Sequence, residues 1–132
     1  MVAQLNRKIL VVEDEEDLRQ ALSEELVRAT YDVLVASNGK EGLVLALKHH
    51  PDLILLDIVM PEMDGMTMLK KLRQDEWGKT ARVIMLTNLN ATDKILKGVT
   101  EDEPSFYLVK SDWKIADIIS KVKEELNLRA EA

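Results

Sequence analysis

Five polar side chains follow predicted strands, and their types suit phosphate and metal chemistry. They comprise two adjacent acids, a third carboxylate, a hydroxyl and an ammonium, namely Glu13, Asp14, Asp57, Thr87 and Lys110. Because most of them offer oxygen atoms, and neither histidine is expected nearby, the set favours a hard cation, Mg²⁺ rather than Ca²⁺. A carboxylate beside such an ion can attack phosphorus and carry an acyl phosphate. We therefore predict phosphoryl transfer to Asp57, with the acid pair holding the ion and the hydroxyl and ammonium gripping phosphoryl oxygens.

Asp57 is the predicted nucleophile because of the segment that carries it. Four consecutive aliphatic residues, Leu53–Leu56, run straight into this aspartate without alternation, which indicates a strand buried on both faces. Pro61 prevents the strand from pairing onward, and the Asp64-Gly65 pair predicts a turn into a helix. In open parallel sheets, ligands bind outside the carboxyl ends of the strands, so Asp57 is expected at the reactive edge.

Five strands alternating with five helices are needed to bring these side chains together. The predicted strands are Lys8–Val12, Asp32–Ala36, the central run from Leu53 to Asp57, Arg82–Leu86 and Phe106–Val109. The predicted helices are Glu15–Ala29, Gly42–His49, Met66–Trp77, Thr92–Val99 and Asp112–Leu126. This alternation predicts an α/β fold, a single doubly wound five-stranded parallel sheet with the flavodoxin-like order 2-1-3-4-5.

Composition narrows the class of protein. The 132 residues, 46% hydrophobic and 32% charged, predict one globular domain over residues 1–132. The absence of cysteine excludes disulfides and thiol catalysis. The net charge of −6 argues against direct nucleic-acid binding. Apolar runs fall short of the roughly 20 residues that span a membrane, and Met1–Arg7 lacks a signal-peptide core, so a cytoplasmic location is expected.

The sequence resembles the response-regulator receiver domains (CheY-like) of two-component signalling over essentially the whole chain. The matching segments are Val11–Glu15, Asp57–Pro61, Asp64-Gly65, Thr87 and Tyr107–Lys110. The resemblance implies that Asp57 receives a phosphoryl group from a histidine kinase's phosphohistidine. It also implies that the acid pair, Asp57 and the backbone carbonyl of Val59 hold Mg²⁺. Thr87 and Tyr107 match the family's switch pair, in which the hydroxyl moves toward the phosphoryl group and the ring turns inward.

The same resemblance implies the partners. These are a histidine kinase or phosphotransfer protein as donor and a downstream protein as target. It further implies a homodimer through the face formed by the predicted elements at Thr92–Val99, Phe106–Val109 and Asp112–Leu126. The chain would be a signalling phosphoacceptor that assists its own phosphotransfer and dephosphorylation, and not an enzyme.

Three positions depart from the family pattern, and two other functions stay open. Asn88 replaces a small residue, Ser111 replaces a proline, and Glu103–Ser105 replaces a Gly-Ala pair. One alternative is a receiver fragment of a longer, DNA-binding regulator. The other is a Mg²⁺-dependent phosphatase with an aspartyl-phosphate intermediate. Such phosphatases carry a second aspartate two positions after the nucleophile, where this sequence has Val59.

Overall fold

A parallel five-stranded sheet forms the centre of the computed structural model, which describes residues 7–58, 60, 62–87, 106–109 and 114–131. Its strands are β1 (Lys8–Val12), β2 (Asp32–Ala36), β3 (Leu53–Asp57), β4 (Val83–Thr87) and β5 (Phe106–Val109). They lie in the order β2-β1-β3-β4-β5, and every pairing is parallel. This is the strand order predicted from the sequence, and β4 is shifted by one residue from its predicted range.

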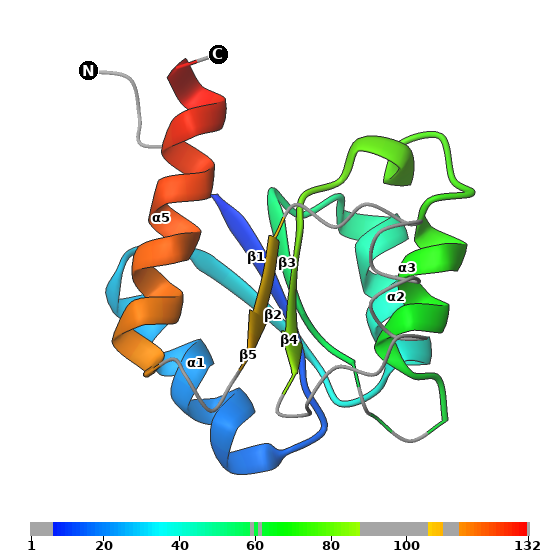
Figure 1. Cartoon of the computed structure of the whole chain (residues 1–132), viewed down its shortest axis with the longest axis horizontal. Coiled ribbons are helices and arrows are strands. Elements are labelled where there is room, and N and C mark those ends of the chain that lie inside the picture. The colour runs from blue at the N-terminus through cyan, green and yellow to red at the C-terminus, as the bar shows by residue number, and fades with distance from the viewer. Residues whose placement is uncertain (1–6, 59, 61, 88–105, 110–113, 132) are drawn as a thin grey trace.

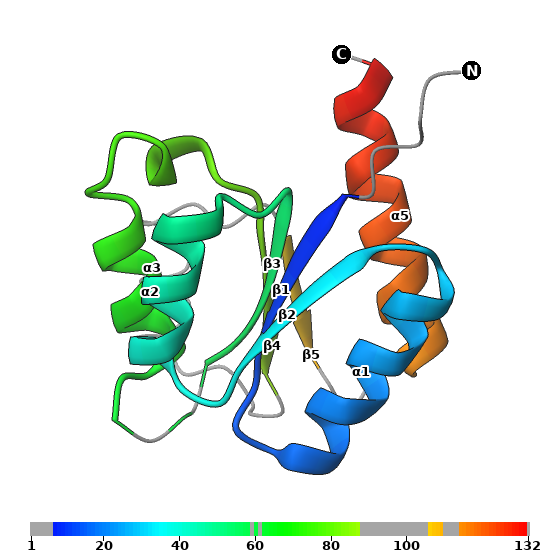
Figure 2. The ribbon, with the colours of Figure 1, turned by 180° about the vertical axis from the view of Figure 1, so that it is seen from behind.

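Helices cover both faces of this sheet (Figures 1 and 2). They are α1 (Glu16–Arg28), α2 (Gly39–His49), α3 (Gly65–Leu72) and α5 (Ile115–Glu131), with a short 3-10 helix, η1 (Gly78–Thr80). α1 and α5 pack on one face, and α2 and α3 pack on the other. The doubly wound α/β fold is therefore confirmed. The predicted helix at Thr92–Val99 lies outside the described residues. Within the described part of the chain, no helix is both long and apolar enough to cross a membrane.

Two hydrophobic clusters sandwich the sheet because successive strand residues face opposite sides. The cluster under α2 and α3 contains Leu10, Ile54, Leu56, Met85, Leu69 and Leu72. The cluster under α1 and α5 contains Ile9, Leu55, Ile84, Leu22, Ile118 and Val122. All five residues of β3 are buried, as the unbroken apolar run predicted. Each of its four aliphatic side chains contributes about 1.5–3 kcal/mol on burial, which anchors the strand that ends in Asp57.

Two helix boundaries differ from the prediction for local reasons. α2 begins at Gly39, not Gly42, because the Asn38 side chain accepts a hydrogen bond from the Glu41 amide at 2.8 Å. α3 ends at Leu72 and does not continue to Trp77. The Arg73 guanidinium donates to the carbonyls of Gly78 (2.7 Å) and Ala81 (2.8 Å), which folds the following segment into a compact loop.

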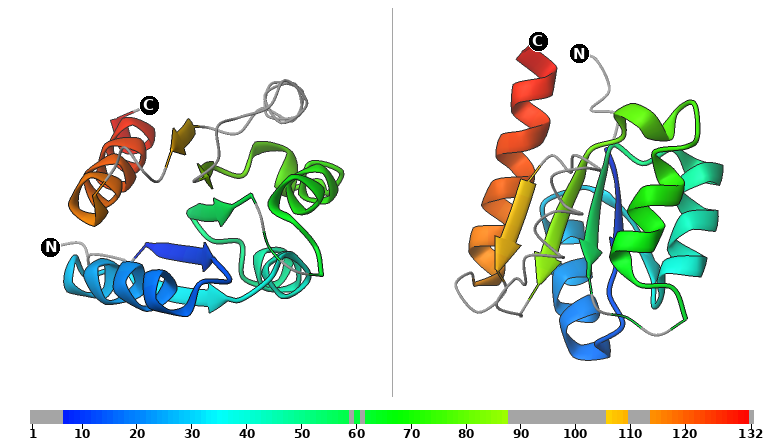
Figure 3. Two further views of the ribbon diagram at one scale, coloured as in Figure 1. Left: turned by 60° about the horizontal axis from the view of Figure 1, so that its bottom comes forward. Right: turned by 45° about the vertical axis from the view of Figure 1, so that its right-hand side comes forward.

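The remaining helices also shift slightly. α1 spans Glu16–Arg28, one residue shorter at each end than predicted. α5 begins at Ile115 and extends to Glu131, five residues beyond the predicted end at Leu126, while its predicted start at Asp112 lies outside the described residues. None of these changes alters the sheet. All strands run in one direction, so their carboxyl ends meet at a single edge (Figure 3).

Candidate functional site

Glu13 is the first acid at this edge and is fixed by its backbone and its side chain. It directly follows β1 and is 1% exposed. Its amide donates to the Ala36 carbonyl at the end of β2 (3.0 Å), and its Oε2 accepts a hydrogen bond from the Glu15 amide (3.1 Å). The side chain is therefore held close to the sheet, and the chain leaves the edge toward α1 with Asp14 exposed to solvent.

Asp57 ends β3 and is 4% exposed. Beyond it, the chain folds back on itself, because the Gly65 amide donates to the Ile58 carbonyl at 2.8 Å. A Cβ atom at Gly65 would lie 2.1 Å from the Asp57 carbonyl oxygen, so this close return requires glycine. Asp64 then caps α3 by accepting from the Thr67 amide at 2.8 Å. The turn predicted at Asp64-Gly65 thus serves to pack the loop against the backbone of Asp57.

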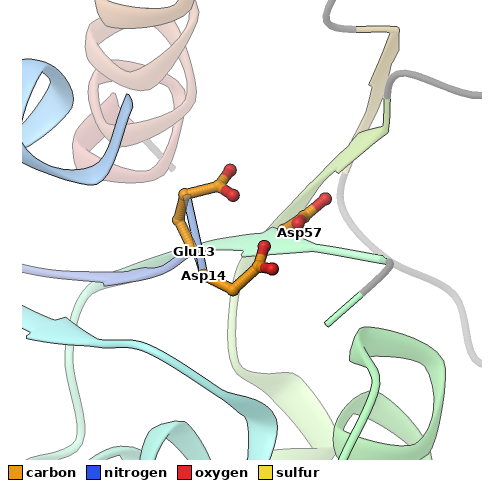
Figure 4. A group of neighbouring side chains, drawn as sticks. All are labelled: Glu13, Asp14 and Asp57. Atoms are coloured by element: carbon orange, nitrogen blue, oxygen red, sulfur yellow. The ribbon is translucent and has the colours of Figure 1, made fainter. Parts of the chain in front are cut away.

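The three carboxylates converge (Figure 4). One oxygen each from Glu13, Asp14 and Asp57 lies within 4.8 Å of the others. Figure 4 shows the two side chains that follow β1 and the one at the end of β3 extending toward the same space. Three like charges at this separation repel each other, and two of the groups are buried, so a cation bound among them would be stabilising.

The donor set fits Mg²⁺. Octahedral Mg²⁺ binds oxygen at about 2.0–2.1 Å, so two ligands on opposite sides lie about 4.2 Å apart. The observed limit of 4.8 Å needs only a small inward movement or a bridging water. The exposed Asp14 leaves one side of the cluster open to solvent, from which an ion and its waters can enter. The cluster of Glu13, Asp14 and Asp57 is therefore consistent with a magnesium site.

The structure places the other predicted site residues only in part. Thr87 ends β4, next to β3, where Asp57 pairs with Leu86 in the register. Tyr107 lies in β5 opposite Met85. For both, the described structure covers the backbone position and not the side chain. Val59 and Lys110 lie outside the described residues, so their predicted roles stay predictions.

Sequence reasoning missed Arg19. This residue lies one turn into α1, and its Nη1 donates to the backbone carbonyls of Glu13 (2.9 Å) and Asp14 (3.4 Å). A signal was available: α1 begins with acids, as the helix dipole favours, and a basic residue close to a helix N-terminus opposes that dipole. Here the side chain finds local acceptors in the loop that carries the acid pair.

The family comparison agrees with this geometry. Residues 9–123 match the family described as the response regulator receiver domain. Three solved structures of similar fold cover nearly the whole chain. CheY4, a chemotaxis protein of Vibrio cholerae, has a TM-score of 0.81 and 28% identity, covering 90% of this chain and 98% of that one. The receiver domain of Francisella response regulator 1452 has a TM-score of 0.82 and 30% identity, covering 94% of this chain and 99% of that one. A CheY-like receiver domain protein of Methanospirillum hungatei has a TM-score of 0.86 and 25% identity, covering 96% and 98%.

The similar curated proteins are longer. RpaA of Synechocystis sp., described as a DNA-binding dual master transcriptional regulator, is 33% identical over 116 residues, which are 88% of this chain and 47% of that protein. The transcriptional regulatory protein HprR of Escherichia coli is 34% identical over 119 residues, 90% of this chain and 51% of that protein. PhoP of Bacillus subtilis, the alkaline phosphatase synthesis transcriptional regulatory protein, is 47% identical over 72 residues, which are 54% of this chain and 30% of that protein. The chain thus spans about a third to a half of the curated relatives it matches.

Proposed function

The chain belongs to the response regulator receiver domain family of two-component signalling, and from this premise we propose that Asp57 is its phosphoacceptor. The observation that carries the proposal is the gathering of Asp57, Glu13 and Asp14, with oxygens of all three within 4.8 Å at the carboxyl edge of the sheet. A buried carboxylate can approach an anionic phosphoryl group only when a cation offsets the negative charge. The same cluster offers the oxygens that Mg²⁺ prefers.

The proposed reaction is an in-line displacement at phosphorus. A bond forms between one Asp57 carboxylate oxygen and the phosphorus of a phosphohistidine. The bond from phosphorus to the histidine nitrogen breaks, and that nitrogen keeps the electron pair and takes up a proton from solvent. Mg²⁺, when bound, neutralises charge on the phosphoryl oxygens. The backbone around Asp57 holds the carboxylate in place, because β3 is buried and the Gly65 amide ties the following loop to Ile58.

The remaining roles in this proposal come from the residues at the strand ends and from the family resemblance. The backbone carbonyl of Val59 completes the metal ligands, and Lys110 and Thr87 hold phosphoryl oxygens. Tyr107 pairs with Thr87 as the switch. The position of Thr87 at the end of β4, the neighbour of β3, supports its part in the proposal.

Partners follow from the same proposal. A histidine kinase or phosphotransfer protein donates the phosphoryl group in the cytoplasm, and a downstream protein reads the phosphorylated surface. In this role residues 1–132 act as one receiver domain, a signalling phosphoacceptor and not an enzyme in the usual sense. Because RpaA is described as DNA-binding and is about twice as long as its match, a longer regulator that contains this chain is compatible with the proposal.

Phosphorylation by acetyl phosphate tests the assignment of Asp57. We expect intact-mass spectrometry to detect one added phosphoryl group in the wild type with Mg²⁺ and none in Asp57→Asn. The matched control is Asp52→Asn, which alters an exposed aspartate whose Oδ2 accepts from the Lys8 amide at the opposite edge (2.8 Å). The control should load normally. An unchanged phosphate load in Asp57→Asn would overturn the assignment.

Amide hydrogen exchange with and without beryllofluoride tests the proposed output surface. Because Thr87 and Tyr107 belong to β4 and β5, we expect the largest changes in protection over Thr92–Val99, β5 and α5, the face also proposed for a homodimer. Changes confined to α1 would contradict this part of the proposal.

A further inference from the structure

Arg19 bridges α1 and the loop that carries the two acids. Its amide makes the ordinary helical bond to the Glu15 carbonyl (2.9 Å), while its side chain turns back toward the start of the helix. There Nη1 lies 2.9 Å from the Glu13 carbonyl oxygen and 3.4 Å from that of Asp14. This direction is natural, because helical side chains lean toward the N-terminus of their helix.

The start of α1 lacks the side-chain capping hydrogen bond that commonly fixes the residues before a helix. The N-cap position of α1 is Glu15, and its side chain makes no capping hydrogen bond. The first-turn acids Glu16 and Asp17 favour the helix dipole but do not constrain the preceding residues. The guanidinium therefore supplies a constraint on the path of the chain between β1 and α1 that the helix cap does not supply.

We propose that Arg19 is a positioning residue for the metal site, and this inference rests on the proposed function. Glu13 is then held at three atoms: its amide by Ala36, its carbonyl by Arg19 and its Oε2 by the Glu15 amide. Fixing both carbonyls of the Glu13-Asp14 pair fixes the direction in which the two side chains leave the backbone. That direction brings their carboxylates within 4.8 Å of Asp57.

Charge and geometry predict opposite effects of removing Arg19, which makes the inference testable. A positive side chain beside the cluster repels a divalent cation, so a purely electrostatic role predicts tighter Mg²⁺ binding when the charge is lost. A positioning role predicts weaker binding, because the loop then samples directions that separate the carboxylates. Outer partners that orient metal ligands typically change metal affinity by about 10–100-fold.

The experiment compares Arg19→Gln and Arg19→Lys with Arg28→Gln. The control removes the same charge from the same helix, at an exposed residue that pairs with Glu25 (2.9 Å). The Mg²⁺ dissociation constant is measured by titration calorimetry on the unphosphorylated protein. Exchange of the Glu15 amide is measured without metal, and a urea midpoint reports stability. We expect Arg19→Gln to weaken Mg²⁺ binding about 10-fold and to speed Glu15 exchange, with Arg28→Gln unchanged in both.

Each outcome decides the proposal. About 10-fold weaker Mg²⁺ binding in Arg19→Gln, with unchanged binding in Arg28→Gln, supports it. Arg19→Lys keeps the charge and shortens the side chain by one bond, so it measures how much of the loss depends on the reach of the donor. Unchanged or tighter Mg²⁺ binding in Arg19→Gln overturns it, whether or not the urea midpoint falls. Failure of the wild type itself to bind Mg²⁺ or take a phosphoryl group would overturn the proposed function instead.

Discussion

The two edges of the sheet use charge in opposite ways. At the amino edge, Arg82 donates to the Glu125 carbonyl (2.6 Å) and pairs with its carboxylate (3.3 Å), and Arg7 donates to the Leu126 carbonyl (3.2 Å). These contacts tie α5 to the strands with complementary partners. At the carboxyl edge, Glu13, Asp14 and Asp57 place like charges within 4.8 Å. The amino edge thus pairs opposite charges, whereas the carboxyl edge gathers like charges, an arrangement that is common at functional sites.

Adding one methyl group at each edge gives the largest expected effects. A Cβ at Gly65 would lie 2.1 Å from the Asp57 carbonyl oxygen, and a Cβ at Gly78 would lie 1.9 Å from that of Leu72. Because each overlap is with backbone, we expect Gly65→Ala and Gly78→Ala to lower the free energy of unfolding by about 3 kcal/mol, measured by urea denaturation.

Phosphorylation by acetyl phosphate should distinguish the two glycine variants. At a temperature where both are folded, we expect acetyl phosphate to load Gly78→Ala normally and Gly65→Ala poorly, because only the second displaces the backbone of Asp57. Equal loading by mass spectrometry would mean that the loop at Gly65 does not fix the carboxylate.

Neutralising one charge at each edge should shift stability in opposite directions. Without Mg²⁺, we expect Asp57→Asn to raise the free energy of unfolding by about 1 kcal/mol, because one of three mutually repelling charges is removed. Arg82→Gln should lower it by about 2 kcal/mol, because charge-assisted hydrogen bonds to α5 are lost. Urea midpoints measure both.

A variant of Glu125 and the addition of Mg²⁺ test the same two effects further. Glu125→Gln keeps the carbonyl that accepts from Arg82 and loses the carboxylate contacts with Arg82 (3.3 Å) and Lys121 (3.7 Å). Because the hydrogen bond to the carbonyl remains, its effect should be smaller than that of Arg82→Gln. Millimolar Mg²⁺ should stabilise the wild type and not Asp57→Asn. A metal-free Asp57→Asn protein less stable than the wild type would show that repulsion does not dominate at the carboxyl edge.

Backbone strain also occurs at both edges. Thr30, between α1 and β2, has φ of 73°, and Glu62, in the loop after β3, has φ of 66°. A β-branched residue tolerates this region worst, so Thr30→Gly should raise the free energy of unfolding by about 1 kcal/mol and Glu62→Gly by about 0.5 kcal/mol. Thr30→Ala, which removes the β-branch but keeps the Cβ, is the control and should gain about half as much as Thr30→Gly. A loss of stability in both glycine variants would contradict the assignment of strain.

Much of this fold follows from local sequence. The apolar run of β3 and the alternation of strands with helices predict the sheet order, because buried parallel strands leave few connections. Helix ends were predicted less well, because side chains decide them. Asn38 starts α2 early, and Arg73 helps to organise the loop that follows α3 at Leu72. Asn38 is a preferred N-cap residue but also favours turns, and the Arg73 contacts are made to main-chain carbonyl oxygens, which every residue carries.

The acid cluster was predictable because strand ends meet at one edge. The register of β1 and β3 brings the backbone of Glu13, Asp14 and Asp57 to the same part of that edge. Arg19 was not predicted, because its target is main-chain carbonyl oxygen, which every residue carries. Gly65 was predicted as part of a turn, whereas its close approach to the Asp57 carbonyl depends on the packing of the loop in three dimensions.

Tyr31 gives the smallest expected effect and tests the amino edge alone. It lies between α1 and β2, half-buried against the cluster under α1 and α5. Burial raises the pKa of its phenol above the ordinary value, and the nearby positive charge of Arg7 partly offsets this. Because the folded protein holds the phenolic proton more tightly than the unfolded chain, the stabilising effect is complete below about pH 10 and is lost as the pH rises through the folded-state pKa.

Tyr31→Phe removes that proton, so its urea midpoint should fall less steeply than that of the wild type above pH 10, with parallel curves between pH 7 and 9. If the urea midpoints of Tyr31→Phe and the wild type fall with the same slope above pH 10, Tyr31 does not contribute to the alkaline loss of stability. If the midpoint of Arg7→Gln falls less steeply than that of the wild type, the charge of Arg7 steepens this loss and does not soften it.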